Sequence, residues 1–345
     1  GKLNLTEGAM ASYHPDFPTP VNPWDSGVWT GVSSSGSGVA TAAGLCFGSL
    51  GSDTGGSIRF PAASCGIVGI KPTWGLVSRY GILALAESMD HVGPMTRSAA
   101  DAGIMLQAIA GHDPNDPTSL PGAATGLLAG MGESVTGIRI GLDLRYIQDD
   151  IDSELSASAL EGIRVMEGLG AEIVEVNMPD TRKYTGAWAV LCSAEAADAH
   201  SATYPSRRDE YGPWFQGWLD KGAEVTDADY AQANNVRAEG NGLLRSVFEE
   251  IDVLACPSTI APPGRVTQEQ LRAPMGGEDD LKWGRFTVPF NFNGAPTISL
   301  PCGQNRDGLP LSLQFVGKHL SEALLVRLGH AYEQATQWHN MRPAV

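Results

Sequence analysis

Two serines in the first part of the chain stand where a hydroxyl could act as a nucleophile. Ser33 begins a run of three serines, and Ser57 follows two glycines, 24 residues later. Glycines let main-chain N–H groups come close to a reacting carbonyl, and such N–H groups stabilise an oxyanion. A serine hydroxyl attacks an amide only if another group takes its proton. The pattern therefore predicts an active site built from hydroxyls and backbone amides.

Histidine is not placed to serve these serines. The chain has seven histidines, and none lies in a G-x-S-x-G turn or another recognisable triad context. We expect His91 and His112 to be solvated loop residues. Asp53 and Arg59 flank the second glycine run, and we expect them to orient this loop as an ion pair rather than to react.

Further motifs surround the two serines in a fixed order. Asn22-Pro23-Trp24 precedes them, and Gly69-Ile70-Lys71-Pro72-Thr73 and Ser78-Arg79-Tyr80-Gly81 follow. With these motifs, the serine spacing and the run Gly55-Gly56-Ser57-Ile58-Arg59, the sequence resembles the amidase signature family of serine hydrolases. The resemblance covers residues 1–118 densely and 250–335 clearly.

The resemblance implies a mechanism with two serines and a lysine. Ser57 would attack, and Ser33 would relay its proton to a neutral buried lysine and then return a proton to the leaving amine. The N–H groups of Thr54, Gly55, Gly56 and Ser57 are implied as the oxyanion hole. In the family a cis peptide bond joins the relaying serine to a preceding glycine, where this chain has Val32.

The lysine of the family lies upstream, in a G-x-P-x-x-x-K-D element. This element is absent from the sequence, so we expect the N-terminal segment of the family domain to be missing here. Lys2 and Lys71 match other family elements, and neither is assigned as the base. A non-catalytic binding protein, or an inert fragment without a base, is therefore one alternative.

The favoured substrate is a small or apolar amide, such as an aliphatic amide, an anilide or a carbamate. Aromatic residues within 181–250 point to an apolar pocket. Met10 is a candidate substrate contact, as are Trp188 and Phe290, although core packing is the more ordinary explanation for each. A second enzyme interpretation is the glutaminase subunit of a tRNA-dependent amidotransferase, because such subunits share the same motifs.

The composition excludes other classes of function. A formal net charge of −16 and a sequence pI near 4.8 repel phosphate groups, which disfavours direct binding of nucleic acid. Five widely spaced cysteines without a C-x-x-C pattern predict reduced, structural thiols. We expect a cytoplasmic enzyme that uses no cofactor or metal, does not bind membranes and acts on a small-molecule amide. The sequence leaves open whether it forms a homodimer.

Alternating strand and helix patterns predict an α/β fold. The apolar stretch 39–50 predicts a buried helix of about three turns. Ser98 and Asp101 fit a capping box at the start of a helix over 98–110. Further helices are predicted over 153–169 and 322–335, with residues 181–250 mainly helical, and strands over 65–70, 138–142, 173–176, 252–257, 297–300 and 311–316.

The strand–helix–strand order over 138–176 predicts a βαβ unit. Together with the family resemblance, this predicts an α/β/α sandwich with a central mixed, twisted β-sheet. We expect one domain over 1–345 that lacks its N-terminal segment. It comprises catalytic core motifs in 1–118, a variable α/β and helical region in 119–250, and the C-terminal part of the core in 251–345.

Overall fold

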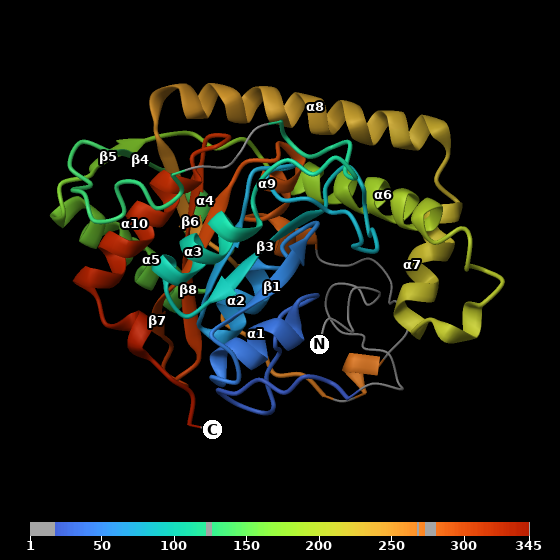
Figure 1. The fold of residues 1–345 in the computed structure, drawn as a ribbon, viewed down its shortest axis with the longest axis horizontal. Helices are drawn as coiled ribbons and strands as arrows, with labels where there is room; N and C mark the ends of the chain where they lie inside the picture. Colours follow the sequence, from blue (N-terminus) through green and yellow to red (C-terminus); the bar gives the residue numbers. More distant parts are fainter. Residues whose placement is uncertain (1–17, 122–125, 268, 273–280, 345) are drawn as a thin grey trace.

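A mixed sheet of eight strands forms the centre of the molecule (Figure 1). The computed structural model describes residues 18–121, 126–267, 269–272 and 281–344. Along the sheet the strands are β1 (Gly48–Asp53), β3 (His91–Thr96), β2 (Val68–Lys71), β7 (Thr297–Gln304), β8 (Pro310–Gly317), β6 (Val253–Pro257), β4 (Arg139–Leu142) and β5 (Glu172–Glu175). The predicted α/β/α sandwich with a mixed sheet is confirmed.

The predicted βαβ unit forms one edge of this sheet. Strand β4 pairs in parallel with β5 on one side and with β6 on the other, whereas the remaining strand pairs are antiparallel. Helix α5 (Ser153–Gly168) connects β4 to β5 and buries Leu155, Ile163 and Met166. These three residues recur at helical spacing, so burying one face of the helix fixes it against the sheet.

Helices cover both faces of the sheet. On one face lie α3 (Ala99–Ile109), α5 and α10 (Glu322–Ala335), and glycines allow this close packing: a Cβ added at Gly329 would lie 2.9 Å from Ile298. On the other face lies α2 (Arg59–Cys65), where Ala62 would meet a Cβ added at Gly69. Gly69 pairs with Ser299, so these two residues face the same side of the sheet, and the neighbouring Ile298 faces the other side. Helix α2 packs at Gly69 and α10 packs at Ile298, so the two helices lie on opposite faces.

The region 181–250 is helical, as predicted. It comprises α6 (Arg182–Ala199), the short 3-10 helix η1 (Arg208–Glu210), α7 (Pro213–Ala223) and α8 (Asp227–Glu250), and α8 runs along the outside of the molecule (Figure 1). The predicted apolar anchors Trp188, Trp214, Phe215 and Trp218 are buried together between these helices. The remaining short elements are α1 (Ser35–Ala42), α4 (Leu144–Gln148), η2 (Gln270–Arg272), η3 (Leu281–Gly284), α9 (Val288–Phe292) and η4 (Trp338–Asn340).

The predicted buried helix over 39–50 is wrong. Helix α1 ends at Ala42, Gly44 adopts a left-handed φ of 74°, and the chain continues into strand β1. Leu45 and Phe47, which a buried helix would have covered, are 80% and 89% exposed. The antiparallel pairing of β1 with β3 decides the outcome, because tertiary pairing overrides a local apolar pattern.

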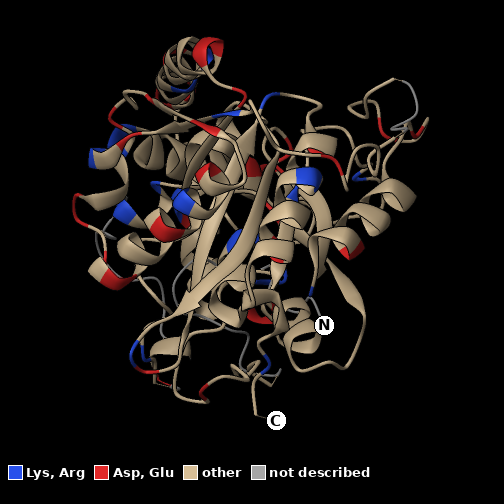
Figure 2. Ribbon diagram, turned by 90° about the vertical axis from the view of Figure 1, so that its left-hand side faces the viewer, with Lys and Arg blue, Asp and Glu red and all other residues tan. Residues whose placement is uncertain are grey.

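Charged residues of both signs are spread over helices and loops around the sheet (Figure 2). All five cysteines are unpaired, and four of them are buried, in accord with the predicted structural thiols. Within the described residues, no helix combines the length and the apolar character needed to cross a bilayer.

Glu333 on α10 gives the fold a testable pH dependence. Its carboxyl group accepts a hydrogen bond from the Ala99 N–H at the start of α3, at 2.8 Å, and burial raises its pKa from 4.5 to about 8. Between these two pH values the native state holds a proton that the unfolded chain releases, so stability falls as the pH rises. We expect Glu333→Gln to flatten this fall, measured by urea unfolding at about pH 5 and about pH 8. The exposed Glu249→Gln is the control; equal pH slopes in the three proteins would contradict the prediction.

Candidate active site

The two predicted catalytic serines lie on neighbouring turns. Ser57 belongs to the tight loop between β1 and α2, and Ser33 lies just before the start of α1. The Ser34 N–H donates to the Ser57 carbonyl oxygen at 3.2 Å, which joins the two turns although 23 residues separate them in sequence. Ser33 is 5% exposed, and the peptide bond between Val32 and Ser33 is cis. Val32 therefore takes the position and the cis geometry that the family resemblance implied for a glycine.

Ser33 lines a small cavity of about 20 Å³, which has room for about one water molecule. Thr54, Asp90 and His91 lie in the same wall. Among the described residues, neither Ser33 nor Ser57 has a protein hydrogen-bond partner for its hydroxyl group.

A buried ion pair holds the loop that carries Ser57. Arg59 donates to both carboxylate oxygens of Asp53, from Nη2 to Oδ1 at 2.8 Å and from Nε to Oδ2 at 3.0 Å, and both side chains are fully buried. The same carboxylate accepts the N–H groups of Gly56 and Ile58 at 2.8 and 3.1 Å. Burial alone would raise the pKa of Asp53, but Arg59 outweighs it, and the pKa lies far below its ordinary value. The predicted ion pair is confirmed.

Asn291 on α9 completes the surroundings of this pair. Its Nδ2 donates to Asp53 Oδ1 at 2.9 Å and to the Asp53 carbonyl oxygen at 3.2 Å. Its Oδ1 accepts from Arg59 at 2.5 Å, and Arg59 also donates to the Thr287 carbonyl oxygen at 3.0 Å. Residues more than 200 positions apart in sequence are thus joined around one carboxylate. No sequence pattern indicated this role for Asn291, because Asp53 lies 238 positions away in the chain.

His91 is buried, which makes the prediction of a solvated loop wrong. It starts strand β3 opposite Asp53, and this pairing places it 2% exposed. Its Nδ1 lies 2.6 Å from the Met89 carbonyl oxygen and 3.1 Å from that of Asp53, so Nδ1 carries the hydrogen. Burial lowers the pKa of His91 well below its ordinary value, which keeps the ring neutral. His112, by contrast, is exposed as predicted.

Thr54 is held at both its side chain and its carbonyl group. Its hydroxyl group donates to Asp90, whose carboxyl group also accepts from the Leu85 N–H at 2.8 Å. Burial raises the pKa of Asp90 from 3.8 to about 6. The indole N–H of Trp188 donates to the Thr54 carbonyl oxygen at 2.9 Å. Asp90 and Trp188 therefore position the loop, a role that the sequence did not reveal for either residue.

Aromatic rings cover both glycines of the loop. A Cβ added at Gly55 would lie 2.7 Å from the ring of Trp188, and one at Gly56 would lie 2.4 Å from the ring of Phe60. Gly56 also has a φ of 137°, which L side chains rarely adopt. Its N–H is already bonded to Asp53, whereas the Gly55 N–H has no acceptor among the described residues. Gly55 thus presents a main-chain N–H beside Ser57 that none of the described residues accepts.

The remaining candidate residues are Met10, Lys2, Phe290 and Lys71. Met10 and Lys2 lie outside the described residues. Phe290 is fully buried in the main hydrophobic core, so it packs rather than lines a pocket. Lys71 is buried, and its Nζ donates to the Ala295 and Pro72 carbonyl oxygens at 2.6 and 3.2 Å, which ties neighbouring segments together. Within the part of the chain that the structure describes, no three metal-ligating side chains converge.

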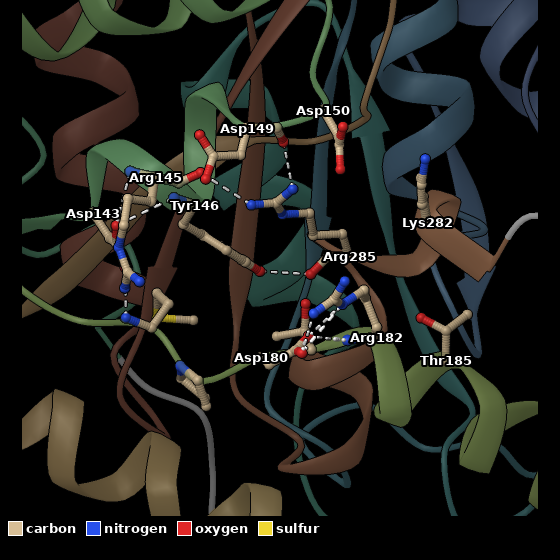
Figure 3. Close-up of a pocket in the computed structure, with 13 residues that line it drawn as sticks. Asp143, Arg145, Tyr146, Asp149, Asp150, Asp180, Arg182, Thr185, Lys282 and Arg285 are labelled. Atoms are coloured by element: carbon tan, nitrogen blue, oxygen red, sulfur yellow. Dashed lines mark hydrogen bonds and ion pairs between the residues drawn. The ribbon is translucent and has the colours of Figure 1, made fainter.

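A larger polar cavity of about 270 Å³ is lined largely by residues that follow β4 and β5 in the chain (Figure 3). Its charges are largely paired with one another: Arg182 with Asp180 at 2.6 Å, and Arg145 with Asp143 at 3.2 Å. Arg285 donates to the carbonyl oxygens of Asp149 and Arg145 at 2.6 and 3.1 Å. The cavity shares no residue with the predicted site.

Known proteins resemble this chain over nearly all of its length. The family model described as Amidase matches residues 1–326. This chain belongs to the amidase family. It is 45% identical to the AmiD protein of Mycobacterium tuberculosis (strain H37Rv), across all of this chain and 72% of that protein. It is 38% identical to a glutamyl-tRNA(Gln) amidotransferase subunit of Halalkalibacterium halodurans, across all of this chain and 76% of that protein.

The fold of this amidase also matches solved structures. A 6-aminohexanoate cyclic dimer hydrolase superposes with a TM-score of 0.86 at 26% identity, over 98% of this chain and 74% of the hydrolase. The chain thus spans about three quarters of the length of these relatives. The expected family, fold class and class of enzyme, an amide-hydrolysing enzyme, are confirmed.

Removing the cation of the buried Asp53–Arg59 ion pair should cause a large loss of stability. Arg59→Met would leave the buried Asp53 carboxylate without its counter-charge, and we expect the free energy of unfolding to fall by about 3–5 kcal/mol. Arg164→Met breaks the pair with Glu161, in which both side chains are 66% exposed, and should cost less than about 1 kcal/mol. Urea unfolding of the three proteins measures both changes. Equal losses in the two variants would show that burial of the pair does not matter.

Proposed function

We propose that this amidase hydrolyses the C–N bond of a small or apolar amide through an acyl-enzyme on Ser57. The observation that carries the proposal is the joining of the Ser33 and Ser57 turns by the Ser34–Ser57 hydrogen bond, beside a glycine loop with an unpaired N–H. Two available hydroxyl groups and a preformed donor are what serine acylation requires.

In this proposal the Ser57 Oγ attacks the amide carbonyl carbon while its proton passes to Ser33. The resulting oxyanion is stabilised by the loop of Thr54, Gly55 and Gly56, with the Gly55 N–H as its main free donor. Ser33 returns a proton to the nitrogen, the C–N bond breaks, and the amine leaves. Water then hydrolyses the ester on Ser57. By family resemblance, a lysine accepts the proton from Ser33, and none of the described residues is assigned to that role.

An apolar acyl group is supported by the aromatic wall beside the loop. Trp283 contacts both Trp188 and Phe60, with ring centroids 5.2 and 5.6 Å apart. The solved hydrolase with a TM-score of 0.86 is named for 6-aminohexanoate cyclic dimer, an amide with aliphatic chains. A second candidate, glutaminase action within an amidotransferase, is supported by the 38% identity to the amidotransferase relative.

Serine variants test the proposed roles. In the full-length protein we expect Ser57→Ala and Ser33→Ala each to lower kcat/KM for an anilide by about 1,000-fold or more, because the serines act as one unit. Ser37→Ala is the matched control, since this hydroxyl group donates to the Leu50 carbonyl oxygen at 2.8 Å and contacts neither serine turn's hydroxyl group among the described residues. Steady-state assays with an anilide and with glutamine separate the two candidate activities.

A fluorophosphonate probe identifies the nucleophile independently of the substrate. Attack by the Ser57 Oγ forms an O–P bond and expels fluoride, which leaves one adduct visible in the intact mass. Peptide mapping should place this adduct on Ser57, and Ser57→Ala should remain unlabelled. An unlabelled wild-type protein that hydrolyses neither substrate would favour a non-catalytic binding role.

A further inference from the structure

The Thr54–Gly55 peptide is held by a side chain from outside the loop. Trp188, on α6 and 7% exposed, donates its indole N–H to the Thr54 carbonyl oxygen at 2.9 Å. The same ring lies so close to Gly55 that an added Cβ would come within 2.7 Å of Cε2 and Cζ2. The indole therefore fixes this peptide both by a hydrogen bond and by contact.

A fixed carbonyl group also fixes the next N–H. The peptide unit is planar, and in the trans form its C=O and N–H groups point in opposite directions. Within the described residues, only Val32–Ser33 and Tyr204–Pro205 are cis, so the Thr54–Gly55 unit is trans. Because the Thr54 carbonyl group points to Trp188, the Gly55 N–H points away from it, and no described residue accepts it.

We infer that Trp188 is a positioning residue of the amidase site: its indole N–H holds the Gly55 N–H in the orientation that receives the oxyanion. This inference rests on the proposed function. The effect is one of preorganisation, because a donor that is already aimed need not reorient as charge develops on the substrate oxygen.

Burial alone does not account for the hydrogen bond. Three other tryptophans, Trp29, Trp74 and Trp283, have buried indole N–H groups without an acceptor in the described part of the chain. An indole can thus be packed here without a partner, whereas that of Trp188 reaches a carbonyl group of the nucleophile loop.

The rings around Trp188 restrict its own movement. Trp283 meets it edge-on with ring centroids 5.2 Å apart, and the Trp218 ring lies 5.7 Å away. Trp283 also packs against Phe60, the ring that covers Gly56. One aromatic cluster therefore backs both glycines, so the indole cannot turn away without disturbing the loop.

The test removes the donor and keeps an aromatic ring. Trp188→Phe in the full-length protein should lower kcat about tenfold to 100-fold with KM nearly unchanged, because the lost interaction acts in the transition state. Trp214→Phe is the matched control: this ring is equally buried in the same cluster and is stacked on Trp218. Affinity for a trifluoromethyl ketone analogue of the substrate should fall in parallel with kcat/KM in Trp188→Phe only.

A second variant guards against a folding defect. Replacing Trp188 by 3-benzothienylalanine exchanges the indole N–H for sulfur and keeps the shape of the ring, so thermal unfolding should be unchanged while kcat falls. Equal kinetics of Trp188→Phe and Trp214→Phe, or a rise in KM alone, would overturn the inference. Ser57→Ala distinguishes failure of the inference about Trp188 from failure of the proposed function. If Ser57→Ala retains wild-type activity, the active site itself is wrongly placed.

Discussion

The structure around the serines depends on one buried carboxylate. Asp53 is completely removed from water, and an isolated charge in that position would cost several kcal/mol. Arg59, Asn291 and two loop N–H groups surround it and offset this cost. The chain between Asp53 and Arg59 must therefore curl so that its own N–H groups face inward. The conformation that presents Ser57 follows from satisfying Asp53.

The outer side of the loop is fixed by other elements. His91 from β3 and Asn291 from α9 hold the Asp53 carbonyl group, while Trp188 from α6 holds that of Thr54. Strand β1 lies at the edge of the sheet and pairs only with β3 among the described strands. An edge strand has few neighbours to restrain its end, so these side chains supply the restraint that further strands would give. The precision of the site comes from contacts between distant parts of the chain.

Sequence patterns predicted the structural features that depend on residues close together in the chain. The capping of α3 by Ser98, the βαβ unit and the Asp53–Arg59 pair all lie within short spacings. The prediction of a helix over 39–50 was wrong because part of this stretch forms strand β1, which pairs with the distant strand β3. The roles of Trp188 and Asn291 could not be predicted, since their partners lie 134 and 238 positions away. The glycines signalled close approach, but the Trp188 ring that approaches Gly55 comes from a distant helix and had no local signature.

Electrostatics then decide how such a loop stabilises negative charge. Arg59 is the cation nearest to the loop in sequence, but the Asp53 carboxylate offsets its charge, and its N–H groups donate to Asp53 and to three neutral acceptors. His91 is neutral, because burial lowers its pKa. In the proposed function, the stabilisation is assigned to oriented N–H dipoles, whose effect depends on direction as well as distance. For a site of this kind, a side chain that fixes the direction of one peptide is as much a part of the chemistry as the group that reacts.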